Sequence, residues 1–462
     1  MAQLPPRSSI LTGDPPTLGE LSQARVGAVR RLIEQVPDAA IRTLETALAH
    51  GAKGDSALTL IQTMVGAEVL ERRVRAMAFS PLLPLCAPPR DALQRLAFPR
   101  TSLAMTWRAL KTAAPDEVAQ ALRAFALMRG DDSPPEIFDA LCSRAAAGVL
   151  ADEEAFRPLI ALLKGQGGDT PKRFADSLGL VPLARRALER LPTWIRTLNN
   201  DHAAAIRLAF RDAAAIDEDA GPPFMEILFC HIEQPHEILR LISLVMDRPS
   251  DRYLAASELA SFGERLLGDL ERRIEEVRRF DLSRGLEGGV AQAGSVQAAT
   301  AVIHEFEQWL ALNKEGPWGK RLTAHKRALA TVVEARLREI EAAVSAALPT
   351  QPARSKTSRG SPRVTADPDP AAVLKAQALM AFLCESRVSA NYGGFGAVRT
   401  KVIETLDPKI EHYAEELLEQ LHAGDGADGD RIRAYLEIAA EFMGLVREPK
   451  AAEILRRRTA VA

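Results

Sequence analysis

Apolar residues recur at steps of three and four along most of the chain, the spacing typical of amphipathic helices. From about residue 20 to residue 248, short segments of this kind alternate with breaks that contain Pro, Gly or Asp. No stretch of four to eight residues shows the polar and apolar alternation with β-branched enrichment that is typical of strands. We therefore predict an all-α protein whose first part is an irregular α-solenoid-like array of short helices.

The apolar stripes become longer between residues 249 and 348. Residues 250–280 contain no proline and predict one helix of roughly eight turns, given 3.6 residues per turn. A glycine-rich stretch at 285–294 predicts a flexible connection to a second helix around 302–310. A third helix is expected from Pro317 to about Leu348. These stripes predict a bundle of three long antiparallel helices.

Composition divides the chain further. Residues 349–370 carry Pro, Ser, Thr, Arg and Lys with almost no large apolar side chain, so they cannot offset the entropy cost of ordering. We predict five parts: a disordered tail (1–19), an N-terminal helical array (20–248), a long-helix bundle (249–348), a flexible linker (349–370) and a C-terminal helical unit (371–462).

Several prolines are placed where a helix can start. A proline costs little in the first helical turn, because the N–H that it lacks has no partner there, and a preceding Ser, Thr or Asp can cap the free amides. Four pairs fit this pattern, and each predicts a helix start: Ser133-Pro134, Thr170-Pro171, Asp369-Pro370 and Asp407-Pro408.

Charge and cysteine content narrow the functional classes. The 59 basic and 61 acidic residues give a net charge of -2. The overall charge therefore gives no reason to expect a polyanionic partner such as a nucleic acid. Abundant Ala and Arg indicate a GC-rich bacterial coding sequence. The four cysteines lie far apart, and the sequence offers neither a secretory signal nor a membrane span. A reducing cytoplasm is the compartment that fits best.

Three motifs were weighed as ligand sites and rejected. Residues 424–429 have the glycine spacing of a dinucleotide-binding turn, but they follow a helix and contain aspartates that would repel phosphate. Residues 316–320 end in Gly-Lys without the rest of a phosphate-binding loop, and we expect Trp318 to anchor the long helix instead. The group Cys230, His231, His236 and Glu237 fits no zinc spacing. The sequence predicts no metal site, cofactor or catalytic residue.

Two breaks carry apolar residues that loops usually lack. They are residues 81–85 and residues 392–396. Such loops either fold inward between helices or form a binding epitope. On the second interpretation the possible partner contacts are Leu82, Leu83, Leu85, Tyr392 and Phe395.

A helical array without a catalytic motif usually presents surfaces to other macromolecules. The leading hypothesis is therefore a non-catalytic cytoplasmic scaffold or adaptor that binds a protein partner. Two alternatives stay open. One is an enzyme whose site is assembled from distant helices. The other is peripheral attachment to a membrane or nucleic acid through Arg-rich segments such as Arg456–Arg458, although the near-neutral composition makes nucleic acid the weaker choice.

Overall fold

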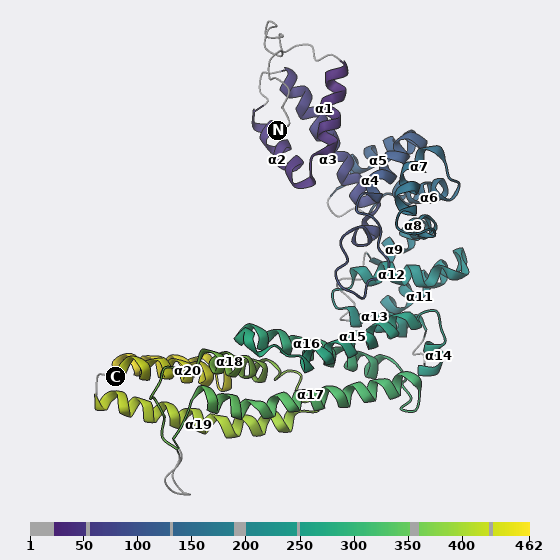
Figure 1. Cartoon of the computed structure of the whole chain (residues 1–462). Coiled ribbons are helices and arrows are strands. Elements are labelled where there is room, and N and C mark those ends of the chain that lie inside the picture. Colours follow the sequence, from purple (N-terminus) through teal and green to yellow (C-terminus); the bar gives the residue numbers. More distant parts are fainter. Residues whose placement is uncertain are drawn as a thin grey trace, which may run out of the picture. The chain divides into compact units, whose positions relative to one another are not determined.

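The computed structural model describes residues 23–51, 56–129, 133–188, 200–246, 250–351, 360–424 and 428–462. These residues form helices joined by turns, and two isolated β-bridges are their only strand-like pairings, so the all-α prediction is confirmed (Figure 1). The predicted tail and the centre of the predicted linker lie outside the described residues. The chain divides into two compact units, residues 1–231 (unit 1) and 232–462 (unit 2).

Unit 1 consists of short helices separated by tight turns. The longest helix, α3, has 23 residues, and several others have ten or fewer. Its elements are α1 (Gln23–Gln35), α2 (Asp38–Gly51), α3 (Ser56–Ala78), η1 (Ser80–Leu82), η2 (Pro84–Cys86), α4 (Ser102–Ala113), α5 (Pro115–Leu127), α6 (Glu136–Leu150), η3 (Glu154–Phe156), α7 (Arg157–Lys164), α8 (Thr170–Gly179), α9 (Val181–Leu188), α11 (Asn200–Ile216), η4 (Glu218–Ala220) and α12 (Gly221–His231).

A buried arginine ties the end of α3 to the core of unit 1. Arg185 of α9 is only 6% exposed, and it donates hydrogen bonds to the carbonyls of Met77 (2.7 Å) and Ala78 (2.6 Å). Its Nε donates to the Asp139 carboxylate of α6 at 3.0 Å. The last carbonyls of a helix have no intrahelical donor, so this guanidinium supplies the strong donors that the Met77 and Ala78 carbonyls need.

Unit 2 contains the long helices. Its elements are η5 (Pro235–Glu237), α13 (Ile238–Val245), α14 (Asp251–Ala255), α15 (Ala260–Arg278), η6 (Leu282–Arg284), α16 (Gly285–Trp309), α17 (Pro317–Ala347), α18 (Pro370–Glu385), α19 (Gly396–Ala423), α20 (Gly429–Val446) and α21 (Pro449–Val461). The long helix predicted from Pro317 is confirmed as α17, and its predicted apolar stripe is buried.

The single helix predicted over residues 250–280 is wrong, because the structure has two helices there. The short α14 is capped by the Ser250 hydroxyl, and α15 starts at Ala260. In the break, the Ser257 hydroxyl donates to the Leu254 carbonyl at 2.8 Å, which satisfies one of the free carbonyls at the end of α14.

The flexible connection predicted at 285–294 is also wrong, since this stretch is the first part of α16. Gly285 has a φ of +56°, which a residue with a side chain rarely adopts. A Cβ at Gly289 would lie 2.2 Å from the carbonyl oxygen of Ala378 in α18. The glycines therefore permit close packing between two helix backbones rather than mobility.

Helices α18 to α21 share the core of the long helices. α18 packs along both α16 and α17, and α19 and α20 pack on α17 and α18 respectively (Figure 1). The Phe280 and Phe382 rings are 5.6 Å apart, and the Thr300 hydroxyl donates to that of Ser389 at 3.3 Å. The chain before α18 is pinned as well, because the Gln351 amide donates to the Ser361 carbonyl and the Arg363 amide to the Pro349 carbonyl, each at 2.8 Å.

The predicted proline helix starts have mixed outcomes. α8 begins at Thr170, and α18 begins at Pro370, where the Asp369 carboxylate accepts a hydrogen bond from the Ala371 amide at 3.1 Å. α6 begins at Glu136, two residues beyond Pro134, and no side chain caps it. The start predicted at Asp407-Pro408 is wrong, as described next.

Pro408 lies inside α19 rather than at a helix start. The Asp407 carboxylate does not cap an amide, because it accepts a hydrogen bond from Arg447 Nε at 2.5 Å. Pro408 has no N–H to donate to the carbonyl of Glu404 one turn earlier, so this carbonyl lacks its usual helical partner. α19 thus has a local interruption of its hydrogen-bond pattern at these residues.

Candidate functional site

The first predicted apolar loop, residues 81–85, lies in the turns η1 and η2. Leu82 and Leu85 are fully buried, whereas Leu83 is 43% exposed. His231 at the end of α12 donates from Nε2 to the Pro81 carbonyl at 2.9 Å and so holds the loop against unit 1. Of the three leucines, only Leu83 is accessible to a partner.

The second loop, residues 392–396, closes onto α16 and α17. Phe395 is fully buried. Tyr392 is partly exposed, but its hydroxyl donates to Glu307 and its ring lies 4.7 Å from the Lys326 ammonium. His304 packs against the same ring edge to face, with centroids 4.9 Å apart. Both aromatic side chains are therefore engaged within unit 2.

In the Gly-Lys sequence at 316–320, backbone amides bind a carboxylate of the chain itself, that of Asp251. Asp251 is 1% exposed, and its two oxygens accept hydrogen bonds from the backbone amides of Trp318 and Gly319, each at 3.2 Å. The amides at a helix N-terminus favour negative charge, and here the carboxylate occupies them. Trp318 is fully buried and its Nε1 donates to Glu264 at 2.7 Å, so its predicted anchoring role is confirmed.

A buried ionic network occupies the interior of unit 2. Arg240 donates to both oxygens of Glu305, at 2.8 and 2.6 Å, and lies 3.6 Å from Glu237. Both glutamates are 3% exposed. Burial lowers the pKa of the neighbouring His236, although the charge of Glu305 opposes this shift. Arg240 thus balances the charge of the buried carboxylates, and such networks are found in protein interiors without a catalytic role.

The described residues give little evidence of a metal site or a reactive thiol. No three of their His, Cys, Asp or Glu side chains are grouped to hold a metal ion. Burial raises the pKa of Cys86 and of Cys142 to about 12, so both thiols stay protonated and unreactive near neutral pH. Among these residues, no helix combines the length and apolar character needed to cross a bilayer.

A charged cavity of about 450 Å³, which we call the basic hollow, lies in unit 1 between the α1–α2 corner, α3 and α4. Trp107 forms part of its wall, and its other main lining side chains are charged. These are five basic and four acidic residues: Arg72, Arg75, Arg100, Arg108 and Lys111, with Glu34, Asp38, Glu68 and Glu71.

Arg72 builds one side of the hollow. Its guanidinium donates to Glu68 and to Asp38, both at 2.7 Å. It also donates to the carbonyls of Ile33, Glu34 and Val36, which end α1. This residue uses its whole donor set to join α3 to the α1–α2 corner, and it is not available to a ligand.

Glu71 builds the opposite side. Its carboxylate accepts hydrogen bonds from Lys111 Nζ at 2.8 Å and from Trp107 Nε1 at 3.3 Å. Because Glu71 belongs to α3 and both donors belong to α4, these contacts fix the width of the hollow. Lys111 is thereby neutralised.

Three arginines of the hollow take no part in these ion pairs and hydrogen bonds. Among the described residues, Arg75, Arg100 and Arg108 have no ion pair and no side-chain hydrogen bond. Arg100 and Arg108 are exposed, and Arg75 is partly buried. Burial lowers the pKa of Arg75, although the charges of Asp38, Glu68 and Glu71 oppose the shift. With five basic and four acidic side chains in its lining, the hollow carries an excess of one positive charge.

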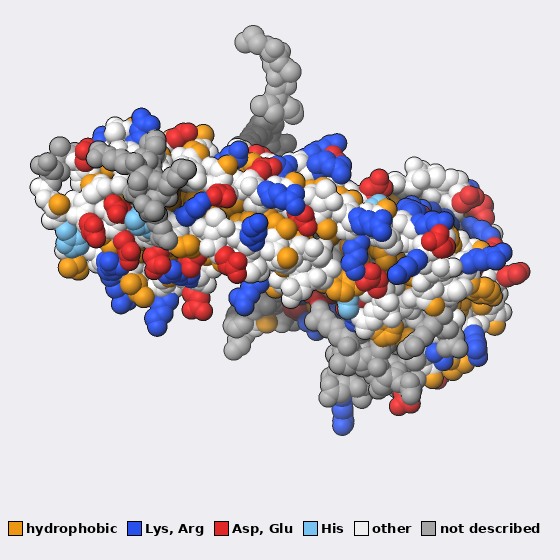
Figure 2. Space-filling model, turned by 90° about the horizontal axis from the view of Figure 1, so that it is seen from below, with side chains coloured by type: hydrophobic (Ala, Val, Ile, Leu, Met, Phe, Trp, Pro, Cys, Tyr) orange, Lys and Arg blue, Asp and Glu red, His pale blue; other side chains and the backbone are white. Residues whose placement is uncertain are grey.

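The hollow differs from the rest of the charged surface because three arginines without ion pairs line one cavity. Figure 2 shows one face of the molecule, where basic and acidic side chains alternate and no extended area carries one sign of charge. The sequence analysis did not identify the hollow. The available signal was weak: Arg72 and Arg75, like Arg108 and Lys111, are three residues apart and so share a helix face.

The chain was compared with protein-family models, with curated proteins and with solved structures, and no match was found in any of the three.

Proposed function

We propose that the protein is a non-catalytic cytoplasmic adaptor, and that it binds an acidic segment of a partner protein in the basic hollow. The proposal depends on one observation, namely that three arginines without ion pairs line one cavity of about 450 Å³. A guanidinium recognises a carboxylate through two parallel charge-assisted hydrogen bonds, so Arg75, Arg100 and Arg108 are suited to Asp or Glu side chains.

The cost of leaving these groups unpaired favours an anionic occupant. A charged group that is withdrawn from water without a counter-ion is destabilising, and Arg75 is partly withdrawn. A carboxylate from a partner would offset that cost. The framework around the site is already fixed by Arg72 and Glu71, so little conformational freedom would be lost on binding.

The four carboxylates of the hollow argue for a peptide rather than a nucleic acid. Glu34, Asp38, Glu68 and Glu71 would repel the continuous charge of a phosphate backbone. A peptide can place a few acidic side chains against the free arginines and neutral or basic ones elsewhere. The net charge of -2 also gives no long-range attraction toward polyanions.

The test is an anisotropy titration of the full chain with a fluorescein-labelled peptide in which three glutamates alternate with glycines. The site variant is Arg75→Gln, Arg100→Gln, Arg108→Gln. The matched control is Arg95→Gln, Arg123→Gln, Arg157→Gln, because these arginines are also exposed and have no ion pair among the described residues. We expect the site variant to weaken binding by about tenfold or more and the control to change it by less than about twofold.

Two results would overturn the proposal. In one, the control variant weakens binding of the acidic peptide as much as the site variant does, which would mean general electrostatic attraction. In the other, a single-stranded oligonucleotide of equal charge binds more tightly than the peptide at about 0.15 M salt. Stoichiometric companions purified from cells with the wild type and with the control, but not with the site variant, would then identify the partner.

A further inference from the structure

A second cavity, in unit 2, has a different character from the basic hollow. It has a volume of about 470 Å³ and lies between the end of α17, the start of the pinned segment at Thr350 and Gly360, and α19. Its floor consists of buried side chains, each 5% exposed or less: Val344, Leu348, Leu406, Ile410 and Tyr413. The cavity is large enough for a small organic molecule.

One polar atom in this floor lacks a partner. The hydroxyl of Tyr413 is buried, and no described residue forms a hydrogen bond with it. Leaving a buried hydroxyl unsatisfied is unfavourable, so native proteins rarely do it. Burial raises the pKa of Tyr413, and the hydroxyl therefore remains protonated and can donate near neutral pH.

A neighbouring tyrosine provides an internal comparison. Tyr435 of α20 is also 3% exposed, and its ring centroid lies 6.5 Å from that of Tyr413. The Tyr435 hydroxyl donates to the Ala366 carbonyl at 3.1 Å. Two tyrosines in similar surroundings thus differ in one respect: the hydroxyl of Tyr435 is satisfied within the fold, whereas that of Tyr413, a residue that lines the cavity, is buried without a partner.

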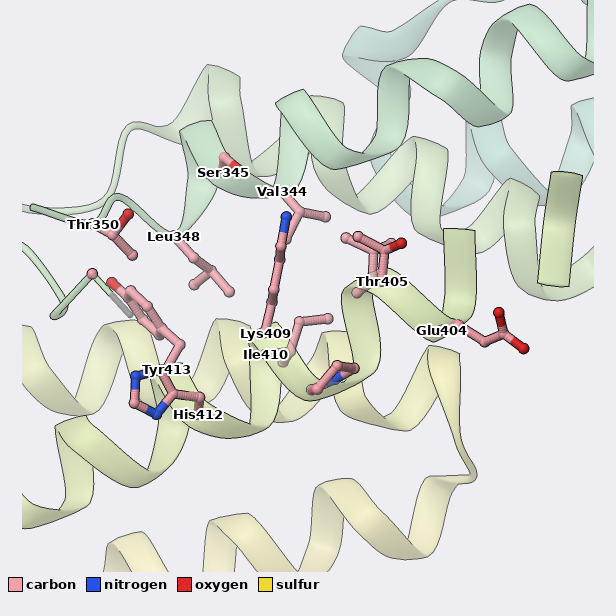
Figure 3. A pocket seen from close by; sticks show the side chains of 13 residues that line it. Val344, Ser345, Leu348, Thr350, Glu404, Thr405, Lys409, Ile410, His412 and Tyr413 are labelled. Carbon is pink, nitrogen blue, oxygen red and sulfur yellow. The ribbon is translucent and has the colours of Figure 1, made fainter. Parts of the chain in front are cut away.

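Figure 3 shows how the side chains surround the space. The Tyr413 ring lies beside Leu348, with its hydroxyl directed to the side where Thr350 stands, and the Glu404 side chain points away from the cavity. Lys409 rises from α19 toward Val344, and its ammonium pairs with Glu341 of α17. Lys409 is therefore already neutralised, and the other basic side chain that lines the cavity, His412, lies 4.0 Å from the Glu416 carboxylate.

We propose that this cavity binds a small, uncharged apolar molecule that carries a carbonyl oxygen, which accepts a hydrogen bond from Tyr413. The apolar floor favours a hydrocarbon or aromatic body. A carboxylate would have to lose its hydration against that floor without a free cation in the wall, so a neutral acceptor is favoured. This inference concerns unit 2 and does not depend on the adaptor function of unit 1.

The probe pair is butyrophenone and butylbenzene, which have similar shapes and differ in the carbonyl oxygen. Binding to the full chain is measured by ligand-observed NMR. We expect the wild type to bind the ketone about tenfold more tightly than the hydrocarbon, which corresponds to one hydrogen bond. Tyr413→Phe should abolish this preference, and Tyr435→Phe should retain it. Ser345→Trp, at an exposed position of α17 that lines the cavity, should weaken both probes.

The result that would overturn the inference is an equal affinity of the wild type for the two probes, or an unchanged preference in Tyr413→Phe. Absence of butyrophenone binding at millimolar concentration would do the same. Tyr413→Phe should fold as well as the wild type, because it removes only an unsatisfied hydroxyl. Its melting temperature, compared with that of Tyr435→Phe, checks this independently of ligand binding.

Discussion

Unit 1 contains arginines in two opposite situations. Arg185 is buried and has its donors occupied by two helix-end carbonyls and the carboxylate of Asp139. Arg75, Arg100 and Arg108 line a cavity and have no ion pair within the described part of the chain. The first arginine stabilises the fold, and we expect the other three to contribute almost nothing to it. Whether a charged group is already satisfied thus separates structural arginines from candidate binding residues.

The largest expected effect is that of Arg185→Met. The substitution leaves the Met77 carbonyl without its guanidinium donor and the Ala78 carbonyl with only the weak Cys142 thiol donor, and it should lower the free energy of unfolding by about 3 kcal/mol. Urea unfolding followed by circular dichroism measures this. The control is Arg186→Met, because Arg186 is the next residue and is exposed. Equal stability of the two variants would remove the distinction between satisfied and free arginines.

Asp251→Ala should have the next largest effect. It removes the carboxylate that occupies the Trp318 and Gly319 amides at the start of α17, and a cost of about 2 kcal/mol is expected. Glu315→Gln, at an exposed acidic residue just before α17, is the control in the same unfolding experiment. Comparable losses in both variants would show that general charge near the helix start matters, rather than this buried contact.

His231 extends the comparison to a partly buried histidine whose charge depends on pH. Burial lowers its pKa below the ordinary value of 6.5. As pH falls from 7 toward 5, the unfolded chain therefore binds a proton more readily than the folded one, and stability decreases. The melting temperature should be lower at pH 5.5 than at pH 7, and the difference should shrink in His231→Gln. A pH dependence that is unchanged in this variant would assign it to other groups.

The smallest effect is expected from the triple substitution of the hollow arginines by Gln. Because these side chains have no ion pairs to lose, the free energy of unfolding should stay within about 0.5 kcal/mol of the wild type. Urea unfolding again provides the measurement. A loss above about 2 kcal/mol would mean that the arginines stabilise the fold, and the binding result would then have to be interpreted differently.

The sequence predicted what depends on local spacing. The apolar stripe from Leu322 to Leu348 gave the extent of α17, and the Asp369-Pro370 pair gave the start of α18. The prediction at 285–294 was wrong because the helix there depends on the backbone of α18, about 90 residues later, for which only glycine leaves room.

The candidate sites could not be predicted from the sequence, for a related reason. The hollow requires Arg72 to meet the end of α1, 36 to 39 residues earlier, and this meeting leaves Arg75 unpaired. Tyr413 and Tyr435 cannot be told apart by sequence, because only the fold brings the Ala366 carbonyl to one of them. The spacing of apolar and polar residues along the sequence does not show which polar groups remain unsatisfied in the fold.

The hydrogen bonds that join residues 349–351 to residues 361–363 have a consequence for how this chain could diverge. The backbone leaves and returns at the same place, since Gln351 meets Ser361 and Arg363 meets Pro349. The length of chain between these pairs can therefore change without moving α17 or α18, and insertions are best tolerated where both ends are fixed in this way. Because Thr350 and Gly360 line the α17–α19 cavity, the same backbone hydrogen bonds hold this part of the cavity wall in place.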